Sequence, residues 1–158
     1  MKWTKIIWIF GFLFLLTQCG SKEAKESKEY KPIPSDTTSK RPLTDFERYV
    51  LFEKGTERPF TGTYWDHFEK GHYVCKNCRA KLFDSSAKFE SDCGWPSFDQ
   101  AIKGSVKYTK DNSLNMERVE VSCANCGGHL GHVFDDGPQN TTGKRFCTNS
   151  VSIEFIPE

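Results

Sequence analysis

The chain carries almost no excess of charge of either sign. Its 22 lysines and arginines nearly balance its 21 aspartates and glutamates, for a formal net charge of +1. Proteins that bind polyanions usually show a basic excess, so the balance argues against a nucleic-acid partner. The sequence also lacks any repeat with a solenoid's period.

Long apolar runs are scarce as well. The run from Ile6 to Leu16 follows Lys2 and Lys5. It is long enough for the apolar region of a signal peptide but too short to cross a bilayer. It ends in LTQCG, which resembles a bacterial lipobox and predicts a signal peptide over 1–18 with lipidation of Cys19. An ordinary secretory signal with a chance cysteine is the alternative.

The segment after Cys19 is poor in apolar residues. From 21 to 41 it is dense in Lys, Glu, Ser, Thr and Pro, and only Ala24, Tyr30 and Ile33 are apolar. Such a stretch cannot bury enough surface to offset ordering entropy, which predicts a flexible tether over 19–42. We therefore expect the protein in the bacterial cell envelope, anchored by lipid on the periplasmic or outer-membrane side. It would be secreted if Cys19 is not lipidated.

Residues 43–158 are expected to form one folded domain. Thr44 and Glu47 have the spacing of a helix capping box, and Gly55 is placed to end that helix. Beyond it, apolar residues alternate with polar ones, as in 118–121 and 150–155, which predicts mainly antiparallel β structure. A domain of this size holds a modest core and benefits from a covalent or metal cross-link.

Seven cysteines are present, and four of them form two Cys-x-x-Cys pairs: Cys75 with Cys78, and Cys123 with Cys126. Two such pairs supply the four thiolates that tetrahedral zinc prefers, so we expect one structural Zn²⁺. Three alternatives stay open. One pair could be a thioredoxin-like redox site, His129 and His132 could replace two of the thiolates, or the four cysteines could form two disulfides.

Cys93 and Cys147 are the two cysteines left after Cys19 is assigned to lipidation and four others to the metal site. Strand periodicity predicts that Arg145, Cys147 and Asn149 share a face with the apolar residues of 151–155. A guanidinium two residues from a thiol can favour the thiolate, which is the reactive form. The alternative for Cys147 is a small buried side chain in a strand.

Four motifs together carry a resemblance to a known family: KGTERPF at 54–60, CGWPSF at 93–98, GGHLGHVF at 127–134 and RFCTNS at 145–150. Through them, residues 43–158 resemble a methionine-R-sulfoxide reductase of the B type, in its zinc-containing subgroup. The resemblance implies a mainly β fold of two antiparallel sheets with a few short helices and a structural zinc site.

The resemblance also implies an activity and roles for single residues. The enzyme would reduce methionine (R)-S-oxide, mainly in oxidised proteins, without an organic cofactor. Cys147 would attack the sulfoxide sulfur and become a sulfenic acid, and Cys93 would then form a disulfide with it for a thioredoxin-like donor to reduce. Residues implied to assist are His132 and His129 for the proton, Arg145 and Asn149 for the thiolate and substrate, and Trp95, Phe134 and Phe146 for the methyl group.

Two other function classes compete with this interpretation. A zinc-stapled binding module would need neither Cys93 nor Cys147, and a general thiol–disulfide oxidoreductase would ignore methionine sulfoxide. Nothing in the sequence indicates an obligate interface, so we expect a monomer that repairs envelope proteins.

Overall fold

The computed structural model describes residues 42–158; the signal, lipidation and tether predictions fall outside them. Besides three 3-10 helices at Ser85–Ala87, Ser113–Asn115 and Ser150–Ser152, one α-helix and nine strands make up the regular structure of this part. Their bounds are α1 Asp45–Glu53, β1 Gly71–Cys75, β2 Lys81–Asp84, β3 Lys88–Phe89, β4 Ser97–Phe98, β5 Val106–Asp111, β6 Arg118–Cys123, β7 His129–Phe134, β8 Arg145–Thr148 and β9 Ile153–Pro157. No helix among residues 42–158 is long and apolar enough to span a membrane.

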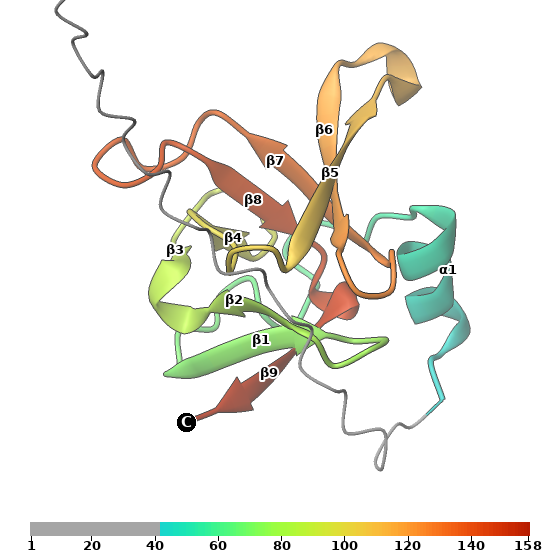
Figure 1. Cartoon of the computed structure of the whole chain (residues 1–158), viewed down its shortest axis with the longest axis horizontal. Helices are drawn as coiled ribbons and strands as arrows, with labels where there is room; N and C mark the ends of the chain where they lie inside the picture. The colour runs from blue at the N-terminus through green and yellow to red at the C-terminus, as the bar shows by residue number, and fades with distance from the viewer. Residues whose placement is uncertain (1–41) are drawn as a thin grey trace, which may run out of the picture.

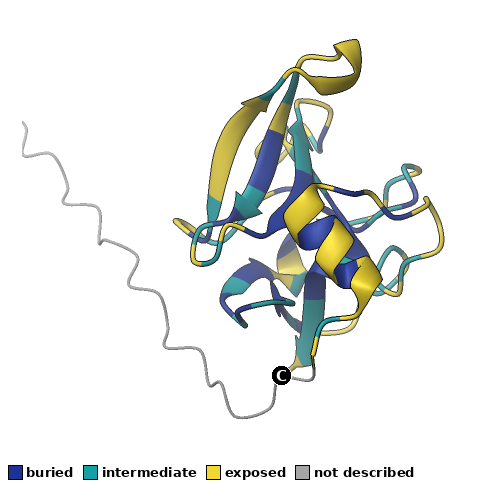
Figure 2. Ribbon diagram, turned by 90° about the vertical axis from the view of Figure 1, so that its right-hand side faces the viewer, coloured by how far each residue is buried: buried dark blue, intermediate teal, exposed yellow. Residues whose placement is uncertain are grey.

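The strands form two antiparallel sheets, which confirms the expected fold class. The smaller sheet has the order β2-β1-β9, and the larger has the order β3-β4-β8-β7-β6-β5. Figure 1 shows the small sheet below the large one, with α1 at one side and the β5–β6 hairpin extending away from the body. The hairpin's tip and the outer face of α1 are largely exposed (Figure 2).

Aromatic rings fill the space between the two sheets. The ring of Tyr73 on β1 meets Phe98 on β4 at a centroid distance of 5.0 Å, and Phe83 on β2 stacks on Phe98 at 4.2 Å. All three side chains are fully buried. Edge and stacked contacts of this kind add to the free energy gained by burying apolar surface, so this cluster joins the sheets.

The capping box predicted for the helix is confirmed. The hydroxyl of Thr44 accepts the amide of Glu47 at 3.2 Å, and the carboxylate of Glu47 accepts the amide of Thr44 at 2.8 Å. The predicted end is off by one residue, because Lys54 and not Gly55 adopts the left-handed conformation, with φ of 58°. Gly55 serves a different purpose: a Cβ there would lie 2.2 Å from the ring of Tyr49.

The single strand predicted from 145 to 155 is wrong. β8 ends at Thr148, a short 3-10 turn follows, and β9 runs in the other sheet. The turn forms because the carboxylate of Glu57 accepts the amides of Ser150 and Val151 at 2.5 and 3.1 Å, which removes them from any strand ladder. Cys147 therefore shares a β8 face with Arg145 only.

Candidate active site and metal centre

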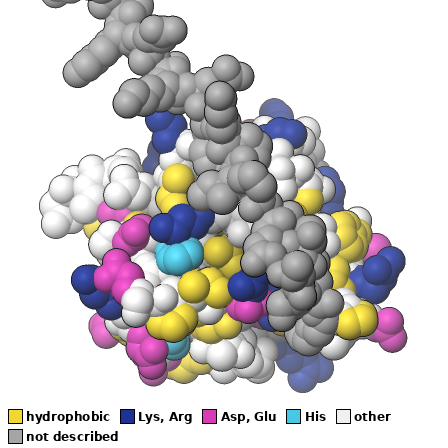
Figure 3. Space-filling view, turned by 60° about the horizontal axis from the view of Figure 1, so that its bottom comes forward, with side chains coloured by type: hydrophobic (Ala, Val, Ile, Leu, Met, Phe, Trp, Pro, Cys, Tyr) yellow, Lys and Arg dark blue, Asp and Glu magenta, His cyan; other side chains and the backbone are white. Residues whose placement is uncertain are grey.

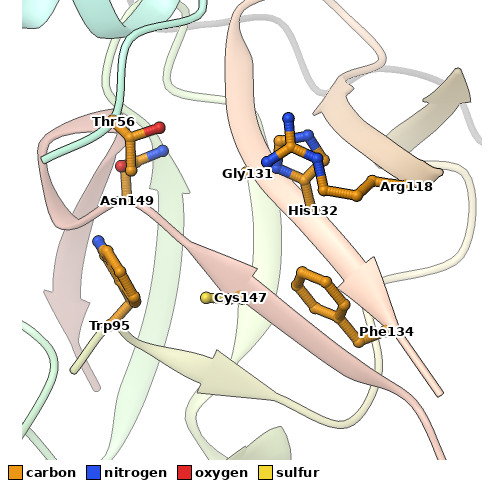
Figure 4. A pocket seen from close by; sticks show the side chains of 8 residues that line it. All are labelled: Thr56, Trp95, Arg118, Gly131, His132, Phe134, Cys147 and Asn149. Atoms are coloured by element: carbon orange, nitrogen blue, oxygen red, sulfur yellow. The ribbon is translucent and has the colours of Figure 1, made fainter. Parts of the chain in front are cut away.

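A cleft of about 130 Å³ opens over one face of the larger sheet (Figure 4). Eight residues line it: Thr56, Trp95, Arg118, Gly131, His132, Phe134, Cys147 and Asn149. Five of them are site residues predicted from the sequence. They come from separate parts of the chain, so the cleft depends on how the strands pair.

Strand register places the polar groups of the cleft in one row. Cys147 on β8 is the cross-strand partner of Ser97 on β4 and of His132 on β7. His132 in turn is paired with Glu120 on β6. Directly opposed residues project from the same face of a sheet at close range, so the thiol and the imidazole are neighbours.

Cys93 and Cys147 meet at the edge of this row. Their Sγ atoms lie 3.8 Å apart, which is contact distance between two free thiols and longer than a disulfide bond of about 2.05 Å. Two hydroxyls surround the Cys93 sulfur, Ser91 Oγ at 3.0 Å and Ser97 Oγ at 3.3 Å. The pair can therefore be oxidised to a disulfide with a small movement.

The hydrogen bond between the two thiols shifts their pKa values in opposite directions. The hydrogen bond from Cys147, together with those of Ser91 and Ser97, lowers the pKa of Cys93 to about 4. The same contact with Cys93, followed by burial, raises the pKa of Cys147, and the charge of Arg145 only partly opposes this. Arg145 thus lowers the pKa of Cys147 in the expected direction, but the Cys93 contact and burial act more strongly the other way.

Arg145 is fixed at the rim by an acidic partner. Its Nε and Nη2 atoms donate to the two carboxylate oxygens of Asp136, each at 2.8 Å. Its guanidinium also lies over the ring of Phe134 at 4.7 Å. Phe134 lines the cleft, whereas Arg145, predicted as a site residue, does not line it and contacts its wall through Phe134.

The two histidines occupy different positions. His129 is 2% exposed, does not line the cleft, and pairs through Nδ1 with Glu120 at 2.8 Å. Burial lowers the pKa of His129. His132 lines the cleft and pairs through Nε2 with Asp111 at 2.7 Å. Of the two, His132 is the one able to reach a ligand in the cleft.

Trp95 and Asn149 are both fastened to the loop that follows α1. The indole Nε1 of Trp95 donates to the carbonyl of Glu57 at 3.1 Å. The side-chain oxygen of Asn149 accepts the amide of Glu57 at 3.0 Å, while its amide group donates to the Leu130 carbonyl at 3.1 Å. These bonds hold an apolar wall and a carboxamide in fixed orientations beside the thiol.

Phe146 was expected at the cleft wall, but it does not line the cleft. It alternates with Cys147 along β8 and so points to the opposite face, where it packs in the core against Phe83 at a centroid distance of 5.9 Å. Phe134 is the phenylalanine that lines the cleft.

The four cysteines of the two Cys-x-x-Cys pairs form one cluster. Their sulfurs all lie within 4.8 Å of one another, and those of Cys75 and Cys126, and of Cys78 and Cys123, are 3.6 Å apart. A tetrahedral ion with metal–sulfur bonds of about 2.3 Å has sulfur–sulfur edges of about 3.8 Å, so this donor set fits such an ion. The separations exclude a disulfide in this state, and the two nearby histidines are engaged elsewhere.

Both cysteine pairs sit on the same kind of backbone turn. The amide of Arg79 donates to the Cys75 carbonyl at 2.9 Å, and the amide of Gly127 donates to the Cys123 carbonyl at 2.8 Å. Arg79 and Gly127 both have positive φ, 65° and 75°. Each turn presents two sulfurs on one side, and together they can hold one metal ion.

A comparison with family models decides which family this fold and site represent. The model of the SelR domain matches residues 43–157. The chain belongs to the SelR domain family.

Three curated relatives of this SelR chain carry the name peptide methionine sulfoxide reductase MsrB. The protein of Leifsonia xyli subsp. xyli (strain CTCB07) is 47% identical over 131 residues, covering 82% of this chain and 94% of its own. That of Leptospira interrogans serogroup Icterohaemorrhagiae serovar Lai (strain 56601) is 50% identical over 130 residues, covering 82% and 98%. That of Chromohalobacter salexigens (strain ATCC BAA-138) is 53% identical over 116 residues, covering 73% and 87%.

Some residues of the SelR cleft were missed by sequence reasoning. Thr56, Arg118 and Gly131 line it, and Glu57 and Asp111 hold its residues in place. Gly131 is needed because a Cβ there would lie 2.0 Å from the Cys147 carbonyl oxygen. Thr56 and Glu57 lie in the 54–60 motif and Gly131 between the two histidines, so position within the motifs was an available signal. Arg118 and Asp111 lie in no motif, and only the strand register reveals them.

Proposed function

We propose that the chain is a peptide-methionine (R)-S-oxide reductase that returns oxidised methionine in proteins to methionine. The observation that carries the proposal is the Cys93–Cys147 contact of 3.8 Å beside a cleft walled by Trp95 and Phe134. The names of relatives at 47% and 50% identity support the same activity. A methylthio group fits an apolar wall, whereas the sulfoxide oxygen needs a proton donor.

The chemistry follows from the positions of the thiols and of His132. The Cys147 proton can pass across the contact to the Cys93 thiolate, which leaves Cys147 as the nucleophile. Cys147 then attacks the sulfoxide sulfur, the oxygen is protonated with the help of His132, and methionine leaves. The oxygen ends on Cys147 as a sulfenic acid, so the sulfoxide gains the two electrons that the thiol loses.

The second half of the cycle uses Cys93. Its thiol attacks the sulfenic sulfur of Cys147, water leaves, and a disulfide forms. An external dithiol of the thioredoxin type then reduces that disulfide. The hydroxyls of Ser91 and Ser97, which lower the pKa of Cys93, support this assignment because they can stabilise the attacking thiolate.

The four-cysteine cluster is proposed to hold one zinc ion. Cys75, Cys78, Cys123 and Cys126 offer four soft donors at tetrahedral spacing with no position left open. Zinc bound there would serve as a cross-link between the two cysteine turns.

Stereospecific reduction is the direct test of the proposed activity. A peptide carrying methionine (R)-S-oxide, incubated with enzyme and dithiothreitol, is expected to lose about 16 mass units, the mass of one oxygen atom. The S epimer is the matched control and should stay unchanged, because only one epimer can direct its methyl group to Trp95 and its oxygen to His132 at once. Equal loss from both epimers, or from neither, would contradict the proposal.

The cell envelope is the proposed location, with Cys19 as the lipid anchor. The support is sequence alone, namely the apolar run that ends in LTQCG. We expect radioactive fatty acid to label the full-length protein in bacteria and to be lost in Cys19→Ala. Equal labelling of that variant and the wild type would contradict the assignment of Cys19 as the lipid anchor.

A further inference from the structure

Asp111 is a carboxylate of the β5–β6 hairpin that pairs with His132, a residue of the cleft. It is the last residue of β5 and the cross-strand partner of Arg118, the first residue of β6. Its Oδ2 atom lies 2.7 Å from His132 Nε2 and accepts Arg118 Nη2 at 2.8 Å. Its Oδ1 atom accepts the amide of Ser113 at 2.9 Å. Both oxygens are thereby held in place.

The ionisation state of Asp111 determines which ring nitrogen of His132 carries a proton. Hydrogen bonds from Ser113 and then from His132 hold the pKa of Asp111 well below its ordinary value. An ionised carboxylate can only accept, so the 2.7 Å contact requires a hydrogen on Nε2. A neutral imidazole has a single N–H, which leaves Nδ1 as the nitrogen with a free lone pair.

Asp111 is also the carboxylate that engages this ring. Glu120, the cross-strand partner of His132, uses one oxygen on His129 at 2.8 Å and the other on Lys54 at 2.7 Å. Other titratable groups near His132 are Arg118 on β6, which shares Asp111 with it, His129 on β7, whose ring centroid lies 5.5 Å away, and Cys147, its cross-strand partner on β8. Figure 4 shows Arg118 lying beside His132 at the cleft.

We propose that Asp111, held by Arg118, is a positioning residue that fixes His132 in its Nε2–H tautomer. The inference rests on the proposed function, in which His132 protonates the sulfoxide oxygen. With Nε2–H held by Asp111, Nδ1 is the nitrogen available to that oxygen. His132 enters the step as the imidazolium, gives its Nδ1 proton to the oxygen, and returns to the neutral form with the proton on Nε2. Asp111 neither gains nor loses a proton.

The tautomer can be measured without any turnover. We would record imidazole ¹⁵N–¹H correlation spectra of reduced, ¹⁵N-labelled protein, which has only four histidines, and assign His132 with a His132→Asn variant. In the wild type, neutral His132 is expected to be almost wholly Nε2–H. In Asp111→Asn the amide can donate as well as accept, so a substantial Nδ1–H population should appear.

The same variant should slow the chemical step. Single-turnover reduction of an R-sulfoxide peptide by Asp111→Asn is expected to be at least about tenfold slower than by wild type, because an amide at 111 neither stabilises the imidazolium nor holds Nε2–H, so Nδ1 is no longer kept toward the sulfoxide oxygen. Glu117→Gln is the matched control, because Glu117 is a carboxylate on the same hairpin whose partner is the exposed Lys110, at 3.1 Å. This control should leave both tautomer and rate at wild-type values.

Two results would overturn the inference. One is a wild-type His132 that is mainly Nδ1–H, which is measurable whether or not Asp111→Asn folds. The other is an Asp111→Asn variant with the wild-type tautomer or with the rate of Glu117→Gln. A wild type that fails to reduce the sulfoxide while showing the Nε2–H tautomer would instead remove the proposed function and leave the Asp111–His132 arrangement intact.

Discussion

Cys93 has unusual surroundings for a thiol in a loop. Hydroxyls of Ser91 and Ser97 lie at 3.0 and 3.3 Å from its sulfur, and Cys147 lies at 3.8 Å. Each of these groups can donate a hydrogen bond to a thiolate, and such bonds favour the charged form. Because the pKa of Cys93 is about 4, the thiolate is present throughout the neutral range and is lost only as the pH falls toward that value.

Replacing Cys93 should separate the two halves of the cycle. Cys93→Ser is expected to reduce one equivalent of R-sulfoxide per enzyme, because Cys147 is still present to attack. Turnover with thioredoxin should then fail, since no disulfide can form. The measurement is the yield of methionine per enzyme with and without thioredoxin. Wild-type steady-state rates from this variant would show that Cys93 has no resolving role.

At the scale of elements, the end of α1 is tied to the active face of the large sheet. Lys54 takes a left-handed conformation, φ 58°, that a residue with a side chain rarely adopts. The conformation places its Nζ atom 2.7 Å from the buried carboxylate of Glu120, which also holds His129. The adjacent Gly55 leaves space for the ring of Tyr49. The helix end therefore supports His129 through Glu120.

Gly55→Ala should destabilise the fold through one identifiable clash. The new methyl group would lie 2.2 Å from the Tyr49 ring, and overpacking of this kind costs about 1–3 kcal/mol. In a Tyr49→Ala background the ring is absent, so the added cost should fall below about 1 kcal/mol. Urea unfolding of the four proteins in this cycle measures the coupling. Equal costs in both backgrounds would mean that the ring is not the obstacle.

On the scale of the whole molecule, the cysteine cluster links the two sheets. Cys75 ends β1 in the smaller sheet and Cys123 ends β6 in the larger, and the turn after each strand supplies the second sulfur. An ion bound by all four would restrain turns that are far apart in the sequence. Its binding free energy would then be part of the folding free energy.

Removing the metal should lower the stability of the whole domain. Purified protein is expected to contain about one zinc per chain, and chelation should lower the thermal midpoint by roughly 10 °C or more. Cys93→Ser is the matched control. Because Cys93 lies outside the cluster, chelation should lower the thermal midpoint of this variant by as much as that of the wild type. Absence of metal together with a mass four hydrogens lower would instead indicate two disulfides and would end the zinc assignment.

The face shown in Figure 3 gives no strong preference for one type of charged partner. Lysine and arginine side chains are interspersed with acidic and apolar ones over the face in Figure 3, in keeping with a net charge of +1. A mixed surface exerts little long-range steering on any one class of protein. Such a surface suits an enzyme that meets many different oxidised proteins.

Much of the site could be predicted from residue types and spacing. The two Cys-x-x-Cys pairs predicted a four-sulfur cluster, and Thr44 with Glu47 predicted the helix start; the structure contains both. Local sequence is enough for such features because a turn or a cap depends on residues only a few positions apart. The error at 145–155 has the same origin, since the alternation there continues through a turn that Glu57 imposes from 93 positions away.

The sequence by itself determined which chemical groups are available, namely two reactive thiols, a histidine pair, an indole and four further cysteines. Only the tertiary structure decided which of them meet. Cys93 and Cys147 are 54 positions apart, and Asp111 is 21 positions from His132. Strand register brings them together, and it is set by hydrogen-bonded pairing across the whole sheet, which no local pattern encodes. For that reason Cys147 and His132 could be predicted as site residues, whereas Asp111, the carboxylate that pairs with His132, had to be observed.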